Sequence, residues 1–508
     1  MQEILSPEQM RGVEKRMMER GVPGLVLMEH AARGVADEAL RRLPRNGRAL
    51  ILCGGGSNGG DGLSALRQLC MRGADAVGAL FVSPEKLAGD ALAQYRMATG
   101  SGLPLIDCSA GFIEDTLTKV GASLLIDALL GTGLSREVTG SFARAVAWMN
   151  GAGLPVISVD IPSGVDAETG RVLGTAVRAD ATVTFQNRKL GHLLFPGRER
   201  SGSVSVVPIG IGESVPGAAV VFEEEDIRSL LPPRPADSHK GKNGRALLAA
   251  GSAQYAGAAL LAASAALRGG CGLLHAAVPQ GIRNVFAQCP GAICHPAGSG
   301  GEWDEDAARD VLPLIEQAGA LGIGPGAGKG EGLPSLLRAF LAAKKPLVID
   351  ADGLNALSAH RELFPLLHGG VVLTPHPAEM ARLTGRPMEE ILARPLRAAQ
   401  EAARSWGCAV ILKGATSVIA EGGQTCLNAT GNTGLAKAGS GDVLTGILLA
   451  LLAQGLPPFP AACAAAYLLG ASAEKAYALL ATRMLTPTDV TDALSFWSSS
   501  PSGPEHAG

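Results

Sequence analysis

The feature that most constrains the fold is a repeated order of short apolar run, glycine-rich turn and helical segment. The 508 residues include 68 glycines, and many of them follow directly on apolar runs. Turns without side chains allow the backbone to approach a ligand closely. Strands that alternate with helical segments are typical of parallel sheets covered on both faces. The pattern therefore predicts an α/β protein.

Length and hydropathy predict more than one domain. A chain of 508 residues exceeds what one hydrophobic core usually serves. With 47% hydrophobic and 18% charged residues, it is too apolar for a disordered chain. A first series of apolar runs covers residues 49–53, 124–127, 156–160, 181–185 and 204–207. A second series has its centres near Leu247, Leu274, Leu321, Val348, Val372, Val410 and Val418.

The segment 211–244 breaks the alternation with EEED, PPRP and SHKGKNG, and we interpret it as a linker and entry loop. We expect a first domain over 1–222, a second over 223–497 and a disordered tail over 498–508. Upstream, Ser6, Pro7 and Gln9 predict a helix start with a capping box.

Charge and cysteine usage narrow the function. A net charge of −3 gives no excess of positive charge with which to bind nucleic acid or an anionic membrane. The nine cysteines contain no CxxC pair, so neither a disulfide framework nor a zinc site is indicated. The N-terminus lacks the apolar stretch of a signal peptide, and the most apolar helical segment, near 446–453, is too short for a bilayer. We expect a soluble, cytoplasmic protein with small-molecule partners.

The first glycine turn, in ALILCGGGSNGGDG, satisfies GxGxxG with Gly54, Gly56 and Gly59. An ordinary dinucleotide-binding domain would show the same spacing. Asn58 and Asp61 add side-chain oxygens that a hydride-transfer cofactor loop does not need.

Two further strand ends carry polar groups. Asp127 precedes a glycine turn in LLIDALLGTGLSRE, and Asp160 and Ser163 lie in VISVDIPSGVDAETG. Each aspartate alone could be a helix N-cap. Since ligands bind at the carboxyl edge of open parallel sheets, we expect these residues to share one pocket with Asn58.

The second half contains NATGNTGLAKAGSGDVLTGILLALLAQG, a glycine-rich loop that leads into a strongly apolar helix. The N–H groups of Gly439, Ser440 and Gly441 can meet the charge that develops in phosphoryl transfer, and Asp442 can act as the general base. The alternative is a capped buried helix.

Other motifs follow strands of the same half. GPGAGKG is not a P-loop, because no Ser or Thr follows Lys329. His376, between two prolines, is either structural or part of a pocket edge. Lys413 suits a nucleotide phosphate and a surface position equally.

The first-half motifs SNGGDG, DALLGTGLSR, VDIPSGVD and ADATVTFQNRKLG resemble the NAD(P)H-hydrate epimerase family over residues 1–215. The resemblance implies a potassium ion ligated by Asn58, Asp127 and Ser163. The implied nucleotide contacts are Ser57, Asn58, Gly59, Gly60, Asp61, Gly131, Thr132, Gly133, Leu134, Ser135, Arg136, Glu137 and Asp160. Ser57 stands where family members usually have Asn. Asp160 is the candidate catalytic acid/base, and the residues leave ring opening available as an alternative route.

The second-half motifs resemble the ribokinase-like NAD(P)H-hydrate dehydratase family over residues 225–495. This implies that Ala258, Gly326, His376 and Asp442 bind the hydrated nicotinamide nucleotide. The implied ADP contacts are Lys413, Gly414, Ala415, Thr416, Ser417 and Gly441. TPHPAE carries Ala378 where the family has Gly, which puts the local turn geometry in question.

Together these resemblances imply two three-layer α/β/α domains, Rossmann-like and then ribokinase-like, in a bifunctional enzyme that repairs hydrated NADH and NADPH (NADHX and NADPHX). The first domain interconverts the R and S hydrates. The second phosphorylates the hydrate with ADP, with Asp442 as catalytic base, and eliminates phosphate; we also expect Mg²⁺ and a homo-oligomer. The alternative is a small-molecule kinase fused to a nucleotide-binding regulatory domain, which would not need Asp127, Asp160 and Ser163.

Overall fold

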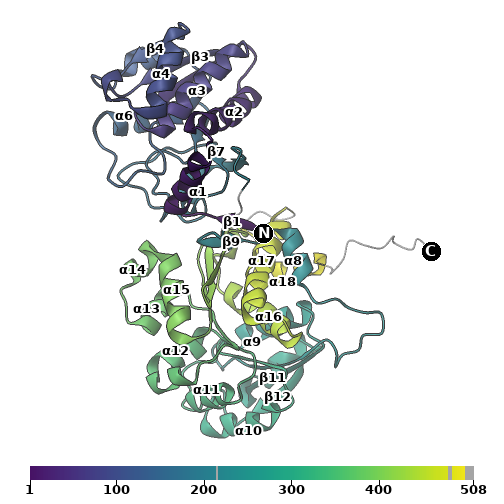
Figure 1. The fold of residues 1–508 in the computed structure, drawn as a ribbon. Coiled ribbons are helices and arrows are strands. Elements are labelled where there is room, and N and C mark those ends of the chain that lie inside the picture. The colour runs from purple at the N-terminus through teal and green to yellow at the C-terminus, as the bar shows by residue number, and fades with distance from the viewer. Residues whose placement is uncertain (213–214, 479–482, 498–508) are drawn as a thin grey trace, which may run out of the picture. The chain divides into compact units, whose positions relative to one another are not determined.

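The computed structural model describes residues 1–212, 215–478 and 483–497. The chain divides into two compact units, one formed by Gln2–Ala219 and one by Val220 onward together with Met1 (Figure 1). The predicted tail, 498–508, lies outside the described residues. Each unit is described by itself.

The N-terminal unit contains a seven-stranded sheet with the order β4-β3-β2-β5-β6-β7-β8, in which all neighbours are parallel. The seven strands are β2 (Arg48–Cys53), β3 (Asp75–Leu80), β4 (Leu105–Asp107), β5 (Leu124–Ala128), β6 (Val156–Val159), β7 (Ala181–Phe185) and β8 (Ser203–Val207). The short strand β1 (Gln2–Ile4) precedes them in the chain and does not belong to this sheet. The helices of the unit are α1 (Pro7–Glu19), α2 (Gly24–Arg42), α3 (Ser57–Met71), α4 (Gly89–Gly100), α5 (Glu114–Lys119), α6 (Gly140–Gly151) and α7 (Gly197–Ser201).

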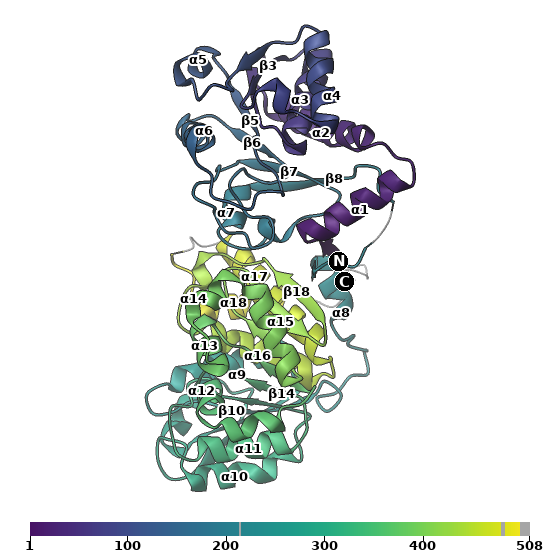
Figure 2. The ribbon, with the colours of Figure 1, turned by 60° about the vertical axis from the view of Figure 1, so that its left-hand side comes forward.

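Helices cover both faces of this sheet. One apolar core joins the sheet to α1, α2 and α3, and a second core on the opposite face includes Leu117 of α5 and Val146 of α6. Figure 2 shows the sheet between these helices. The predicted three-layer α/β/α arrangement is confirmed. The predicted capping box is also present, because Ser6 Oγ accepts the Gln9 N–H at 3.1 Å and Gln9 Oε1 accepts the Ser6 N–H at 2.9 Å.

The strand order places the functional loops. From β2 the chain moves outward to β3 and β4, then returns to β5 on the other side of β2. The loops after β2 and β5 therefore diverge at a topological switch point, where open parallel sheets bind their ligands.

The sheet of the C-terminal unit has the order β9-β18-β17-β16-β15-β14-β13-β10-β11-β12. Its strands are β9 (Ala219–Val221), β10 (Arg245–Ala249), β11 (Leu273–Pro279), β12 (Ile293–Ala297), β13 (Ala320–Ile323), β14 (Leu347–Ile349), β15 (Val371–Leu373), β16 (Ala409–Leu412), β17 (Ser417–Glu421) and β18 (Gln424–Asn428). Its α-helices are α8 (Glu224–Leu230), α9 (Ala256–Arg268), α10 (Glu305–Ile315), α11 (Leu333–Ala342), α12 (Ala351–Ala359), α13 (Pro377–Thr384), α14 (Met388–Ala393), α15 (Pro395–Trp406), α16 (Ser440–Ala453), α17 (Pro458–Tyr477) and α18 (Pro487–Ala493).

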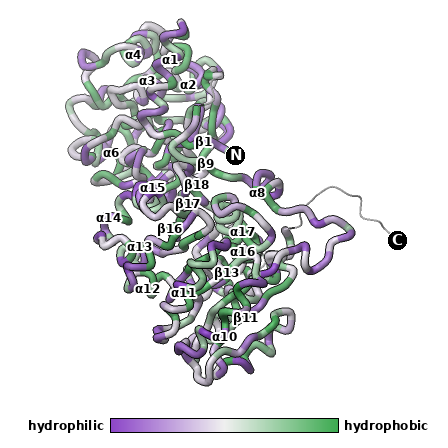
Figure 3. Tube along the Cα trace, turned by 60° about the horizontal axis from the view of Figure 1, so that its bottom comes forward, coloured by the Kyte–Doolittle hydropathy of each residue, from purple (hydrophilic) through white to green (hydrophobic). Residues whose placement is uncertain are grey.

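The strands β10 to β16 are parallel, while β17 runs antiparallel to both of its neighbours. One face of the sheet packs on α9, α16 and α17, and the other on α10, α11 and α12. This unit also has three layers. The apolar helix α16 lies almost wholly in the first of these cores and is strongly hydrophobic in Figure 3. Within the described part of the chain, no helix is both long and apolar enough to cross a membrane.

The linker interpretation of 211–244 is wrong in part. Residues 219–221 form strand β9, which pairs with β18, and 224–230 form α8. The EEED charges that suggested a linker lie mainly in the first turn of α8, where acidic side chains stabilise a helix. The strand predictions also missed β1, β3, β4, β12 and β18. In β12 a proline is tolerated because the strand lies at a sheet edge.

The turn after β2 gives a test of packing. A Cβ at Gly59 would lie 2.0 Å from the Gly54 carbonyl oxygen, whereas a Cβ at Gly56 would meet nothing within 4 Å. We expect Gly59→Ala to lower the free energy of unfolding of the N-terminal unit by about 3 kcal/mol, since backbone must move. Gly56→Ala, the matched control, should change it by about 1 kcal/mol or less. Denaturant unfolding measures both, and equal effects would contradict the described turn.

Candidate active sites

The loops after β2 and β5 meet at the switch point of the N-terminal sheet. A Cβ at Gly54 would lie 1.9 Å from the Leu129 carbonyl oxygen, and one at Gly131 would lie 3.1 Å from Asn58 Cβ. The glycines thus allow the two loops to pack directly on each other. Of the predicted loop 131–137, Gly131 is placed against Asn58, while Gly133 and residues 135–137 are exposed.

Asp127, at the end of β5, is fully buried. Its carboxylate accepts hydrogen bonds from Ser163 Oγ (2.5 Å), Ser163 N (2.8 Å) and Ser158 Oγ (2.8 Å). These bonds bring the predicted pair Asp127 and Ser163 together. Burial raises the pKa of Asp127 above its ordinary value, although the Ser163 and Ser158 hydrogen bonds oppose the shift. Within the described residues no cationic side chain pairs with this carboxylate.

Asn58 lies in the first turn of α3 and is only 7% exposed. Both polar atoms of its amide are buried without a hydrogen-bond partner in the described structure. Buried amides without partners are costly, so the site is suited to a bound group that supplies them. An unpartnered amide oxygen, a serine hydroxyl and a buried carboxylate without a counter-charge together fit a monovalent cation, which prefers oxygen ligands.

Asp160 follows β6 with a positive φ of 62° and is held by a buried lysine. Lys189 Nζ donates to Asp160 Oδ1 at 2.5 Å, to Thr184 Oγ1 at 2.8 Å and to the Phe185 carbonyl at 3.1 Å. Burial by itself would raise the pKa of Asp160, but the Lys189 ammonium and the hydrogen bonds lower it below its ordinary value. Asp160 is therefore ionised at neutral pH, and a carboxylate in this form can accept a proton.

His192 supports the same loop as a neutral imidazole. Its Nδ1 accepts the Lys189 backbone N–H at 2.9 Å, so Nε2–H donates to the Asp160 carbonyl oxygen at 2.8 Å. Burial and the nearby Lys189 charge lower the pKa of His192 to about 4. Sequence reasoning missed Lys189 and His192 as functional residues, although both lie in or beside the quoted motif QNRKLG.

Asp61, a predicted substrate contact, is 8% exposed on α3. Burial, together with the charges of Asp160 and Glu14, raises the pKa of Asp61 well above its ordinary value. Glu14 of α1 is a further carboxyl that sequence reasoning missed, and burial also raises its pKa. The first centre therefore combines one carboxylate whose pKa is lowered, Asp160, with carboxyls whose pKa values are raised.

In the C-terminal unit, Asp442 lies in the first turn of α16, directly after the turn at Gly439 (φ 99°). Burial and the charges of Asp350 and Asp352 raise the pKa of Asp442 to about 7, against the opposing effect of Lys413. A carboxyl with this pKa can accept a proton near neutrality.

Lys413 follows β16 and reaches the same place. Its Nζ donates to Asp350 Oδ1 at 2.7 Å and lies 3.9 Å from Glu379 Oε2. A Cβ at Gly441 would lie 3.4 Å from Lys413 Nζ, so these two predicted ADP contacts are neighbours. Although burial opposes it, the Asp350 and Glu379 charges raise the pKa of Lys413, which is thus a fixed cation and not a loose surface charge.

The other predicted residues of this centre lie near the loop after β13 and in the connection from β16 to β17. A Cβ at Gly326 (φ 57°) would lie 2.8 Å from Ala258 Cβ, so Gly326 and Ala258 are adjacent. Residues 414–416 lie in the connection from β16 to β17, and Ser417 is the first residue of β17. The loop after β13 is held by Asp352, whose Oδ2 accepts the Gly328 N–H at 2.8 Å.

His376 has a structural role in this structure. Its Nδ1 accepts the Ala378 and Glu379 N–H groups, which makes it the N-cap of α13, and Glu379 completes the capping box. The side chain is 47% exposed, and burial lowers its pKa, so a neutral face is open to a ligand. Ala378 lies inside α13 without a positive φ. The question over its turn geometry is thereby answered, because alanine fits this backbone well.

Comparisons with known proteins decide the family. Residues 24–191 match the model "YjeF-related protein N-terminus", and residues 246–495 match the model for NAD(P)H-hydrate dehydratase. A bifunctional NAD(P)H-hydrate repair enzyme of Moorella thermoacetica is 38% identical over 94% of this chain and 92% of its own length. One of Salinibacter ruber is 37% identical over 96% and 95%.

The chain belongs to the family of bifunctional NAD(P)H-hydrate repair enzymes. Its N-terminal unit is the epimerase and its C-terminal unit the dehydratase. A solved ribokinase-like superfamily protein of Enterococcus faecalis matches with a TM-score of 0.50 and 26% identity, over 56% of this chain and 97% of that chain. The alternative of a kinase with a regulatory domain is not favoured, since the relatives match both halves.

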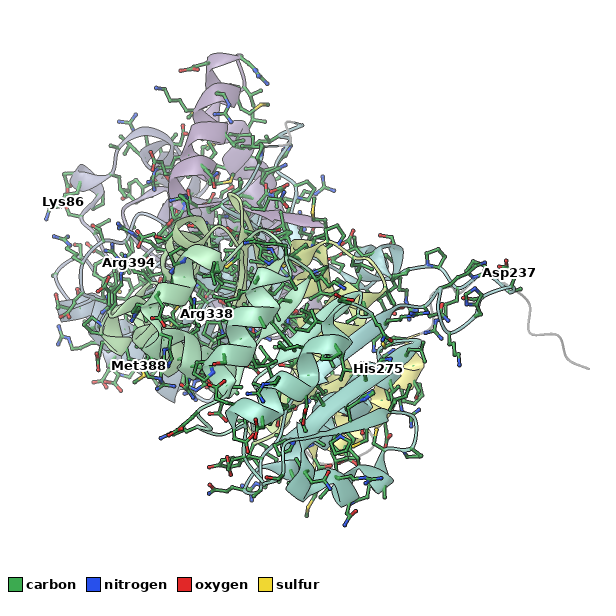
Figure 4. The ribbon with its side chains drawn as sticks, turned by 90° about the horizontal axis from the view of Figure 1, so that it is seen from below. Lys86, Asp237, His275, Arg338, Met388 and Arg394 are labelled. Atoms are coloured by element: carbon green, nitrogen blue, oxygen red, sulfur yellow. The ribbon has the colours of Figure 1, made fainter. Side chains whose placement is uncertain are left out.

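The Lys189–Asp160 pair gives a prediction on stability. Removing one partner of a buried ion pair leaves the other unpaired, and we expect Lys189→Met to destabilise the N-terminal unit by about 3–5 kcal/mol. Lys189→Met with Asp160→Asn removes both charges and should recover much of this loss. Lys86→Met, at an exposed site labelled in Figure 4, is the control and should change stability by less than about 0.5 kcal/mol. Chemical unfolding at pH 7 tests all three; a double variant no more stable than Lys189→Met would refute the pairing argument.

Proposed function

We propose that the dehydratase uses ADP as phosphoryl donor and Asp442 as general base. The observation that carries this proposal is the position of Asp442, at the start of α16 and beside Gly441, Lys413 and Asp350, with a pKa of about 7. Asp442 takes the proton of the C6 hydroxyl of the hydrated ring, and the hydroxyl oxygen attacks the β-phosphorus of ADP. AMP leaves, and the C6 hydroxyl has become a phosphate ester.

Elimination completes the reaction. The C6–O bond breaks and phosphate departs with the bonding pair. The departing phosphate accepts the proton of the neighbouring C5, and the electron pair of that C–H bond restores the C5–C6 double bond of NADH or NADPH. The Lys413 ammonium and the N–H groups at the start of α16 meet the negative charge on the transferred group. Magnesium, when bound with the nucleotide, would neutralise further phosphate charge.

For the epimerase we propose that the ionised Asp160 carboxylate accepts the proton of the C6 hydroxyl. Loss of this proton lets the oxygen form a carbonyl while the C6–N1 bond breaks and its electron pair stays on N1. Closure of the ring on either face of the carbonyl, with the proton returned to the oxygen, regenerates either configuration at C6. The alternative route, departure of the oxygen, needs a proton donated to the hydroxyl instead. Lys189 keeps Asp160 ionised, and Asn58 and Asp61 present polar groups on the neighbouring loop. The predicted nucleotide contacts at Ser57–Asp61 and Gly131–Glu137 belong to this proposal.

We further propose that Asn58, Asp127 and Ser163 hold potassium in the epimerase. The unpartnered Asn58 amide and the uncompensated charge of Asp127 support it. The ion would supply positive charge near the substrate's phosphates. Cytoplasmic location and a homo-oligomeric assembly stay predictions.

The two activities should separate by mutation. We expect Asp442→Asn to abolish recovery of NADH absorbance from hydrated NADH and ADP, while R/S exchange continues at the wild-type rate. Asp160→Asn should slow exchange at least about 100-fold and leave dehydration of the S hydrate intact. Spectrophotometry and chiral separation of the hydrates give both rates. Substantial NADH recovery by Asp442→Asn would disprove the proposed base.

The dehydratase should also depend on pH through Asp442. The base must be ionised to accept a proton, so kcat/KM should decrease as the pH falls below about 7, the pKa of Asp442 in the free enzyme. This decrease is the acidic limb of the pH profile. A pH profile of the wild type measures the limb. A flat profile between pH 5.5 and 8 would contradict the assignment, with these limits set roughly one unit or more either side of the limb.

Potassium gives a test of the epimerase centre. We expect K⁺, added to protein in choline buffer, to raise the melting temperature of the N-terminal unit. The expected rise is several degrees, or about 1–2 kcal/mol of binding linkage. Asn58→Leu should abolish the rise, and Lys86→Met, at an exposed position, should keep it. No K⁺-dependent shift in the wild type would overturn the cation proposal.

A further inference from the structure

The carboxylate of Asp350 joins three parts of the dehydratase centre. Asp350 follows β14 at the N-cap position of α12, where an aspartate usually turns back to bind its own helix. Here its side chain makes no cap hydrogen bond. Instead Oδ1 accepts from Lys413 Nζ at 2.7 Å and Oδ2 accepts from Thr445 Oγ1 at 2.8 Å.

The position of Asp350 is buried and closely packed. The residue is 1% exposed, and Thr445 is fully buried. A Cβ at Gly441 would lie 3.6 Å from Asp350 Oδ2 and 3.4 Å from Lys413 Nζ. The turn that begins α16 therefore lies within contact distance of the ion pair.

Thr445 connects this pair to the catalytic helix. It lies three residues after Asp442 in α16, so both side chains lie on the same side of the helix. The Thr445 hydroxyl is thus a fixed link between Asp350 and the helix turn that carries Asp442.

We propose that Asp350 is a positioning residue of the dehydratase, which fixes Lys413 and the first turns of α16 together and keeps a negative charge beside Asp442. This inference rests on the proposed role of Asp442 as base. It goes beyond that role, because it names the group that sets both the placement and the basicity of the base.

The charges around Asp442 come from several elements. Asp350 and Asp352 of the β14–α12 region are negative, and Lys413 after β16 is positive. Glu379 and His376 of α13 face Lys413. Among these neighbours Asp350 is the largest charge contribution that disfavours ionisation of Asp442, after burial itself. Removing the charge should therefore make Asp442 easier to ionise.

The test is Asp350→Asn, which keeps shape but removes the charge. We expect kcat to fall at least tenfold and KM for ADP to rise, because Lys413 loses its partner. KM for hydrated NADH should change less than threefold. The acidic limb of the dehydratase pH profile should move to lower pH by about one unit. A merely structural role would lower kcat without moving the limb, and that result would overturn the proposal.

The control is Asp237→Asn. Asp237 also pairs with a lysine, Lys242, at 3.0 Å, but both side chains are exposed and Asp237 lies at the surface in Figure 4. This variant should leave kcat, both KM values and the limb unchanged. An equal shift of the limb in Asp237→Asn would show a general charge effect and would also overturn the proposal.

A second pair of variants covers the case in which Asp350→Asn does not fold. Thr445→Val removes one hydrogen bond and keeps every charge, so kcat should fall while the limb stays in place. Thr445→Ser restores the hydroxyl and should restore kcat. Wild-type kcat in Thr445→Val would contradict the link to α16. If Asp442 is not the base, the Asp442→Asn variant will keep its dehydratase activity. That result would refute the proposed function, and it is distinct from every outcome above.

Discussion

Both candidate active centres depend on the same interaction, a largely buried aspartate at the end of a parallel strand that is paired with a lysine from a neighbouring segment. In the epimerase the pair is Asp160 and Lys189, and in the dehydratase it is Asp350 and Lys413. Burial without such a partner raises the pKa of a carboxyl. The pair therefore fixes one negative charge at each sheet edge and leaves nearby carboxyls easier to protonate.

This arrangement separates the roles of neighbouring acids. In the epimerase the pKa of Asp160 is lowered, while that of Asp61 is raised by burial and by the Asp160 charge. In the dehydratase the charge of Asp350 acts with burial to raise the pKa of Asp442 to about 7. Groups whose environments shift their pKa values apart are suited to opposite acid and base tasks. The scaffold supplies these environments because parallel strands bring their carboxyl ends to one edge.

Much of this could be predicted from the sequence. Glycine turns after apolar runs located the loops of both centres, and the motifs named Asn58, Asp127, Asp160, Lys413 and Asp442. Each of these residues follows a strand or opens a helix, so local pattern was sufficient to find it. The structure of the segment 211–244 was harder to predict, because the charges of EEED are equally compatible with a loop and with the first turn of a helix.

The partners of those residues could not be found in this way. Lys189 lies in a quoted motif, but sequence alone does not distinguish a buried lysine from a solvated one. From the sequence, Asp350 would be predicted to be an ordinary helix N-cap. Only the fold shows that its carboxylate binds Lys413 and Thr445, which lie 63 and 95 residues later in the chain. Such pairings depend on tertiary packing between distant segments, which no local pattern encodes.

The account is tested most directly by the titration of individual carboxyls in the free protein. Carbon-13 NMR of labelled aspartate side chains, assigned with Asp160→Asn and Asp442→Asn, would follow each group from about pH 2, well below the ordinary aspartate pKa, to about pH 9. The account predicts that Asp160 titrates below its ordinary value and Asp442 close to 7. An Asp442 that titrates near 4, like an ordinary exposed aspartate, would contradict it.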